Sequence, residues 1–75
     1  MGRYVAELAR LGYVYRRDSI GEHFEKGTRR ITVTHVGPLW SVFVNERRAG
    51  GFTLIARSHG LFDAEAAHNW MLGFV

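Results

Sequence analysis

The chain has 75 residues, with 10 Lys and Arg, 7 Asp and Glu, 4 His and no Cys, which gives a formal net charge of +3. This length predicts a single domain over residues 1–75, and a content of 47% apolar and 13% aromatic residues is too rich for a disordered chain. The lack of Cys excludes a disulfide framework and thiolate metal sites, and no apolar run is long enough to predict a membrane span.

The first predicted element is a short helix over Tyr4–Leu11, because its apolar residues form one stripe at 3.6 residues per turn. Gly12 follows as a residue that readily adopts the left-handed conformation at a helix end. Tyr13 can then pack back on Leu8, as in a Schellman motif. A helix this short is marginal alone, so its stripe is expected to dock on the rest of the domain.

The middle of the chain predicts three to five strands. Tyr13–Arg17 and Glu22–Glu25 are short strand candidates separated by a loop over residues 18–21, and this region either joins the sheet or forms a longer loop. The three clearly patterned strands are Arg29–Val36, Leu39–Asn45 and Phe52–Ser58. Gly37-Pro38 separates the first two, and a hairpin loop over residues 46–51 separates the last two. Short loops between consecutive strands indicate an antiparallel meander.

A second helix is predicted after Asp63, which is a good N-cap residue. Its apolar stripe contains Ala67, Trp70, Met71 and Phe74. Both helices carry an apolar stripe, and the simplest arrangement places them on the same face of the sheet. The expected fold is a two-layer α+β domain with an N-terminal helix, an antiparallel sheet of three to five strands and a C-terminal helix.

Alternation along the strands predicts two different sheet faces. The face under the helices is expected to hold Ile31, Val33, Trp40, Val42, Val44, Phe52, Leu54 and Ala56. The opposite face is expected to hold Arg30, Thr32, Thr34, Ser41, Phe43, Thr53, Ile55 and Arg57. An open face with an aromatic ring and Arg is typical of folds that stack RNA bases, whereas Phe43 and Ile55 equally suit a protein partner or a second copy. A simply solvated face is the third interpretation.

The net charge is concentrated in the first half of the chain. Residues 1–38 carry seven basic and four acidic side chains, and residues 39–75 carry three of each. Arg is suited to bidentate contacts with phosphate and carboxylate groups. The candidate binding residues are Arg16, Arg17, Arg29, Arg30, Arg47 and Arg48, together with Phe43, Ile55 and Arg57. Electrostatic binding, to nucleic acid or to an acidic protein surface, is expected to centre on the first half.

The sequence offers few groups for catalysis. The four His residues, at positions 23, 35, 59 and 68, lack the helical spacing of a metal-binding pair, so we expect no metal and no cofactor. The Ser residues are not set in a nucleophile elbow, so a serine hydrolase is not expected either.

One segment nevertheless resembles a catalytic family. Residues 5–36, with Leu11-Gly12-Tyr13 closing a helix, Gly21-Glu22-His23-Phe24 and then Arg30-Ile31-Thr32-Val33-Thr34-His35, resemble the HicA-type toxins. This resemblance implies a fold like that of double-stranded-RNA-binding domains and cleavage of mRNA, with His23 as the general acid or base. The chain departs from the family at Glu22 and Thr34, where the family has Ser and Pro, and by two additional strands before the closing helix.

At the level of class, the chain resembles small accessory proteins of phages and mobile elements, including anti-CRISPR proteins. This likeness implies a non-enzymatic cytoplasmic protein that inhibits or modulates a larger protein or nucleoprotein complex. A sheet with an exposed edge is compatible with a monomer or a homodimer. A nucleic-acid-binding module and the HicA-like ribonuclease are the alternatives. The first residues, Met1–Glu7, lack a signal-type hydrophobic run, so an intracellular protein is expected. No membrane partner is expected, because no apolar run is long enough to span a bilayer.

Overall fold

The structure, a computed structural model, describes residues 3–75, so of the N-terminal segment considered above Met1 and Gly2 lie outside it. Helix α1 (Arg3–Arg10) is the first element and ends one residue before the predicted Leu11. Gly12 has a φ of +95°. The Gly12 N–H donates to the Ala9 carbonyl and the Tyr13 N–H to the Leu8 carbonyl, both at 3.0 Å. This is the Schellman pattern, which brings Tyr13 and Leu8 into the core.

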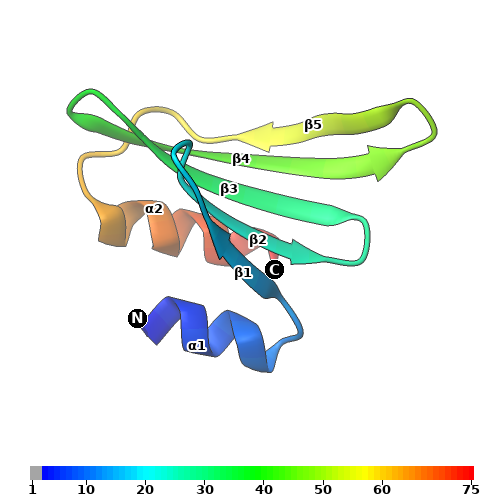
Figure 1. Cartoon of the computed structure of the whole chain (residues 1–75). Helices are drawn as coiled ribbons and strands as arrows, with labels where there is room; N and C mark the ends of the chain where they lie inside the picture. Colours follow the sequence, from blue (N-terminus) through cyan, green and yellow to red (C-terminus); the bar gives the residue numbers. More distant parts are fainter. Residues whose placement is uncertain (1–2) are drawn as a thin grey trace.

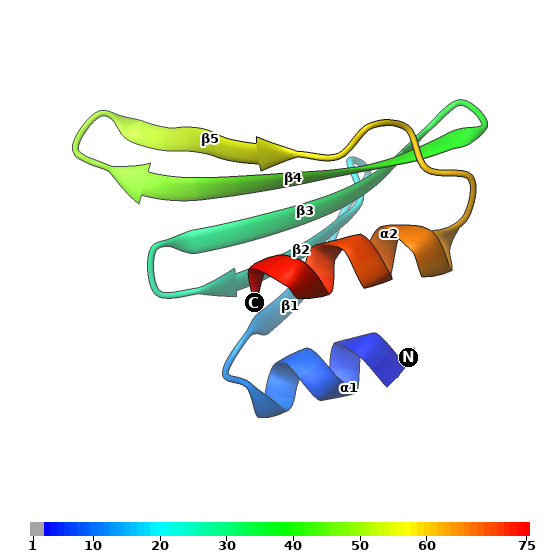
Figure 2. The ribbon, with the colours of Figure 1, turned by 180° about the vertical axis from the view of Figure 1, so that it is seen from behind.

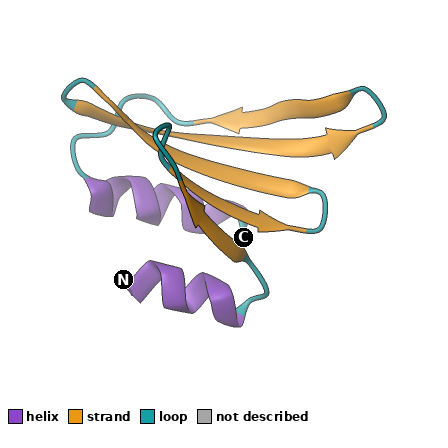
Figure 3. Cartoon of the chain, viewed as in Figure 1, coloured by secondary structure: helices purple, strands orange, loops and turns teal. Residues whose placement is uncertain are grey.

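The five segments that follow form one antiparallel sheet in the order β1-β2-β3-β4-β5 (Figures 1 and 3). The strands are β1 (Val14–Arg17), β2 (Glu22–Lys26), β3 (Arg29–Val36), β4 (Leu39–Arg48) and β5 (Gly51–Arg57). The two short segments that the sequence left open are therefore strands. The predicted loop over residues 46–51 is reduced to a tight turn at residues 49–50, since β4 runs three residues further than expected.

The chain closes with helix α2 (Ala64–Met71) and a 3-10 turn (Leu72–Phe74). Asp63 caps α2 as predicted: its side chain accepts a hydrogen bond of 2.7 Å from the Ala66 N–H. Arg29 holds the C-terminal turn in place, because its guanidinium donates to the Phe74 carbonyl at 2.8 Å.

Both helices lie on the same face of the sheet, as Figures 1 and 2 show from opposite sides. The fully buried core joins one residue of α1 and two of α2 to the central strands: Leu8, Phe24, Ile31, Val33, Val42, Val44, Ala67 and Met71. The predicted two-layer α+β architecture is confirmed. The other face of the sheet has no helix over it, so it is the side of the molecule on which the strands are open to a partner.

The pairing of β4 with β5 contains a bulge that changes which side chains reach this open face. Val44 lies opposite Ala56, but the next residue, Asn45, lies opposite Leu54, so Ile55 has no partner on β4. One additional residue in a strand moves all side chains beyond it to the other face.

The prediction that Phe52 and Leu54 lie under the helices is therefore wrong. Phe52 is paired with Arg47 and Leu54 with Asn45, which both belong to the open face, and the two side chains are 40% and 50% exposed. Thr53, expected on the open face, instead pairs with Glu46 on the helix side. The bulge thus adds two apolar side chains to the open face.

In the part of the chain that the structure describes, no helix is long and apolar enough to span a bilayer.

Candidate nucleic-acid interface

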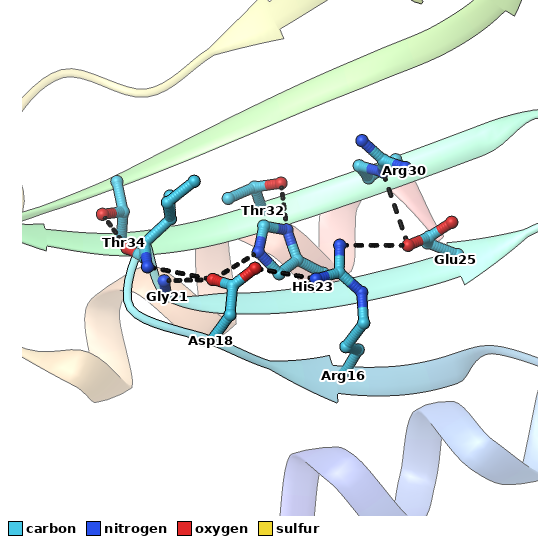
Figure 4. A network of polar contacts seen from close by, with 9 residues as sticks. Arg16, Asp18, Gly21, His23, Glu25, Arg30, Thr32 and Thr34 are labelled. Carbon is cyan, nitrogen blue, oxygen red and sulfur yellow. Dashed lines mark hydrogen bonds and ion pairs between the residues drawn. The ribbon is translucent and has the colours of Figure 1, made fainter.

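The open face contains a row of registered residues that crosses all five strands. The row consists of Arg16, His23, Thr32, Phe43 and Arg57, each paired with the next on the neighbouring strand. Registered residues of an antiparallel sheet project to the same side, so these five side chains lie next to one another. The polar part of the row, on β1 to β3, is shown in Figure 4.

His23 lies at the centre of a polar network on β1 to β3. Its side chain is only 6% exposed, its Nε2 lies 3.0 Å from Asp18 Oδ1, and its Nδ1 lies 3.0 Å from the Thr32 hydroxyl. The hydrogen bond with His23, followed in effect by those from the Ile20 and Gly21 N–H groups and from Arg16, holds the pKa of the Asp18 carboxyl well below its usual range. Asp18 is therefore an ionised carboxylate, which can only accept hydrogen bonds, so Nε2 of His23 is the donor of this one. Both ring nitrogens of His23 therefore have a hydrogen-bond partner within the protein.

Arg16 closes this network from the solvent side, as Figure 4 shows. One guanidinium nitrogen lies 2.7 Å from Asp18 Oδ2 and the other 3.6 Å from Glu25 Oε1. Arg30 Nε lies 3.4 Å from the same oxygen of Glu25. Two of the predicted binding residues, Arg16 and Arg30, thus have their charge largely balanced by carboxylates of the same sheet face.

The other two predicted residues of the first half lie on the helix side. Arg29 pairs with Glu46 at 3.0 Å, and the hydrogen bonds from Arg29 and then Thr28 hold the pKa of the Glu46 carboxyl below its usual range. Arg17 lines a hollow of about 320 Å³ between residues 18–22 and the stacked rings of His35 and Trp40. The structure does not bring the four arginines of residues 16–30 together into one basic patch.

Unbalanced positive charge is instead found on the β4–β5 hairpin. Among residues 3–75, no carboxylate lies within ion-pair distance of Arg47, Arg48 or Arg57. Arg48 is exposed near the turn, opposite Gly51. Arg47 and Arg57 project from the open face, which gives this hairpin the positive charge that an anionic partner requires.

Three arginines of the open face, Arg30, Arg47 and Arg57, lie over aromatic rings. The Arg57 guanidinium is 5.4 Å from the centre of the Phe43 ring. Phe52 has two such neighbours, with Arg30 at 4.1 Å and Arg47 at 5.3 Å from its ring centre. Such cation–π contacts hold a flat ring and a charged group side by side. The sequence analysis did not assign Phe52 to the open face, because no residue pattern indicated the bulge.

Ile55, the second apolar residue predicted for the open face, is the unpaired residue of the bulge and is 39% exposed. The structure therefore separates it from the registered row that contains Phe43 and Arg57. Within the described residues, no group of three or more His, Asp and Glu side chains is arranged to hold a metal ion.

Comparisons with protein-family models, with curated proteins and with solved structures found no match to this chain.

The Asp18 network predicts a pH-dependent stability. A carboxyl whose pKa is lower in the folded chain stabilises the fold above its unfolded pKa, about 3.9, and this contribution is lost as the pH falls through the folded pKa. Asp18→Asn, which removes the charge that faces Arg16 and His23, is expected to lower the thermal midpoint at neutral pH. The difference from the wild type is expected to shrink below about pH 4.

Asp63→Asn is the matched control, because Asn caps a helix about as well as Asp does. Thermal unfolding followed by circular dichroism from pH 7 to pH 2.5 measures both variants. A difference between Asp18→Asn and the wild type that stays constant over this range would contradict the electrostatic interpretation.

Proposed function

We propose that the protein is a non-enzymatic binding protein whose open sheet face binds single-stranded nucleic acid along the β4–β5 hairpin. The observation that carries this proposal is the pairing of aromatic rings with arginines, Phe43 with Arg57 and Phe52 with Arg47, on a face with no helix over it. Single strands are held by positively charged surfaces that follow the backbone and by rings on which the bases stack.

The two kinds of side chain have complementary parts in this proposal. Arg47 and Arg57 attract phosphates, since neither is balanced by a carboxylate in the described part of the chain. The exposed ring of Phe52 offers a stacking surface of the kind that contributes about 1–3 kcal/mol per base. A double helix, with its bases already stacked, would gain only the electrostatic part.

The surface charge also indicates where on the sheet a strand lies. On the β1–β2 side of the open face, Arg16 is paired with Asp18 and Glu25, so its charge is largely balanced and attracts an anion little. The β4–β5 side has no carboxylate on its open face, since Glu46 points to the helix side with Arg29. We therefore place the nucleic acid over β4 and β5 and not over the basic first half of the chain.

An acidic protein surface is the competing partner, and with it the inhibition of a larger complex that the class-level likeness implies. Phe43 and the hairpin arginines suit such a partner too. Of the two partners, only a single strand offers exposed bases for stacking. Binding to single strands that persists when a duplex of equal charge is added as a competitor therefore supports the proposal. Catalysis by His23 gains no support from the geometry, because both of its ring nitrogens are bonded within the fold.

The charge of the hairpin can be tested with Arg57→Gln. The variant is expected to weaken binding to a short single strand and to reduce the slope of log Kd against log salt by about one unit, because one phosphate contact is lost. Fluorescence anisotropy with labelled oligonucleotides between about 50 and 200 mM salt gives both quantities.

Arg10→Gln is the control for Arg57→Gln. Arg10 is an exposed residue in the last turn of α1, away from the open face, so this variant changes the net charge equally. An equal loss of affinity in the two variants would show that net charge alone drives binding and would contradict a site on the hairpin.

Stacking can be tested with Phe52→Ala, for which we expect a loss of affinity of about tenfold, in the range measured for base–aromatic contacts. Phe62→Ala is the matched control, because Phe62 lies between β5 and α2 and is 86% exposed. The control is expected to bind like the wild type. Unchanged affinity of Phe52→Ala in the same anisotropy assay, with its fold verified by circular dichroism, would remove stacking from the account.

A further inference from the structure

Three apolar side chains form a stepped line along the β4–β5 hairpin on the open face, with Phe43 on β4 and Leu54 and Phe52 on β5. Phe43 lies in the row of Arg57, Leu54 in the row of Asn45, and Phe52 in the row of Arg47. Residues 43, 45 and 47 are alternate positions of β4, so consecutive rows are about 6.6 Å apart. The bulge at Ile55 creates this line, because it brings Leu54 and Phe52 to the same face as Phe43.

The spacing of these rows resembles the spacing of neighbouring bases in an extended single strand. The line therefore provides one apolar contact for each of three consecutive nucleotides, with a ring at either end and an aliphatic side chain in the middle. Arg57 stands at the Phe43 end, and Arg47 stands at the Phe52 end. Both ends combine stacking with charge, whereas the middle position has Leu54 beside a neutral amide.

That amide belongs to Asn45, which lies between Arg30 on β3 and Leu54 on β5. Asn45 is partly exposed, and within residues 3–75 its side chain has no hydrogen-bond partner. An amide offers a donor and an acceptor side by side. A free amide beside an apolar contact is a combination that can read the edge of a base.

We propose that Asn45 recognises the middle base of this three-nucleotide track and favours adenine. Adenine presents an amino donor next to a ring-nitrogen acceptor on both its Watson–Crick edge and its Hoogsteen edge, so the amide can pair with it in either orientation of the base. Guanine, cytosine and thymine or uracil each present one matching edge, the Watson–Crick edge, since the Hoogsteen edge of guanine offers only the acceptors N7 and O6. This inference rests on the proposed binding of single strands.

The test compares the wild type with Asn45→Ala on labelled oligonucleotides of one base type, each prepared as DNA and as RNA. We expect the wild type to bind adenine tracts about twofold more tightly than cytosine tracts, because two edges of adenine and one edge of cytosine match the amide. Asn45→Ala is expected to lose this preference and to bind both kinds of tract more weakly than the wild type. Asn69→Ala, at an exposed position of α2, removes an amide from the helix side and is expected to keep the preference.

The outcomes separate the two proposals. Binding without a base preference, or a preference that survives in Asn45→Ala, would overturn the role of Asn45 and leave the binding function standing. Failure of the wild type to bind any single strand would overturn both, and a protein partner or a simply solvated face would then be the remaining interpretations of the open face. A preference found only in the RNA or only in the DNA series identifies which of the two the site accepts, since the 2′-hydroxyl is the difference between them.

Discussion

The architecture depends on one constraint, which is that two helices of eight residues cover a single face of a five-stranded sheet. All of the fully buried apolar side chains, such as Leu8, Phe24 and Met71, meet on that side. The opposite face must therefore be stable in contact with water or with a partner. The two halves of the open face meet this requirement differently. On β1 to β3 the polar side chains pair with one another, whereas on β4 and β5 arginines without a carboxylate partner in the described part of the chain lie beside aromatic rings.

The polar network is best understood as part of the fold. A nearly buried His23 would cost free energy if its nitrogens lacked partners, and Asp18 and Thr32 satisfy them. The same carboxylate accepts from the Ile20 and Gly21 N–H groups and so fixes the turn between β1 and β2. Gly21 packs against the Val33 carbonyl at a place where any β-carbon would collide with it. These contacts anchor β1 to the sheet. The positive charge that remains available to a partner is therefore that of the arginines on the β4–β5 hairpin.

Much of the fold follows from local signals that act over a few residues. The end of α1 at Gly12, the N-cap at Asp63 and the alternation of Arg29–Val36 each depend on neighbours in the chain, and each was predictable. The bulge at Ile55 was not, because it results from how two strands pair and leaves no residue type as a signal. One unpaired residue was enough to reverse the predicted faces of Phe52 and Leu54.

The sequence predicted the kinds of residue in the candidate site better than it predicted the position of the site on the sheet. Phe43 and Arg57 were assigned to the open face from alternation and lie there. The charge excess of the first half was a poor guide, because ion pairs depend on tertiary neighbours: Arg29 meets Glu46 and Arg30 meets Glu25. Counting residues gives every arginine the same weight. In the folded protein, the positive potential of the surface comes mainly from the arginines that have no carboxylate beside them.

The location of the binding surface is the central claim, and chemical-shift mapping by NMR tests it most directly. Titration of the isotope-labelled protein with a short single-stranded oligonucleotide is predicted to shift the amide signals of β4 and β5 around Phe43, Asn45 and Phe52. Signals from α1 and from Asp18 are predicted to stay in place. Shifts that centre on the helices or on the basic residues of β1, or the absence of any shift at saturating oligonucleotide, would contradict the account.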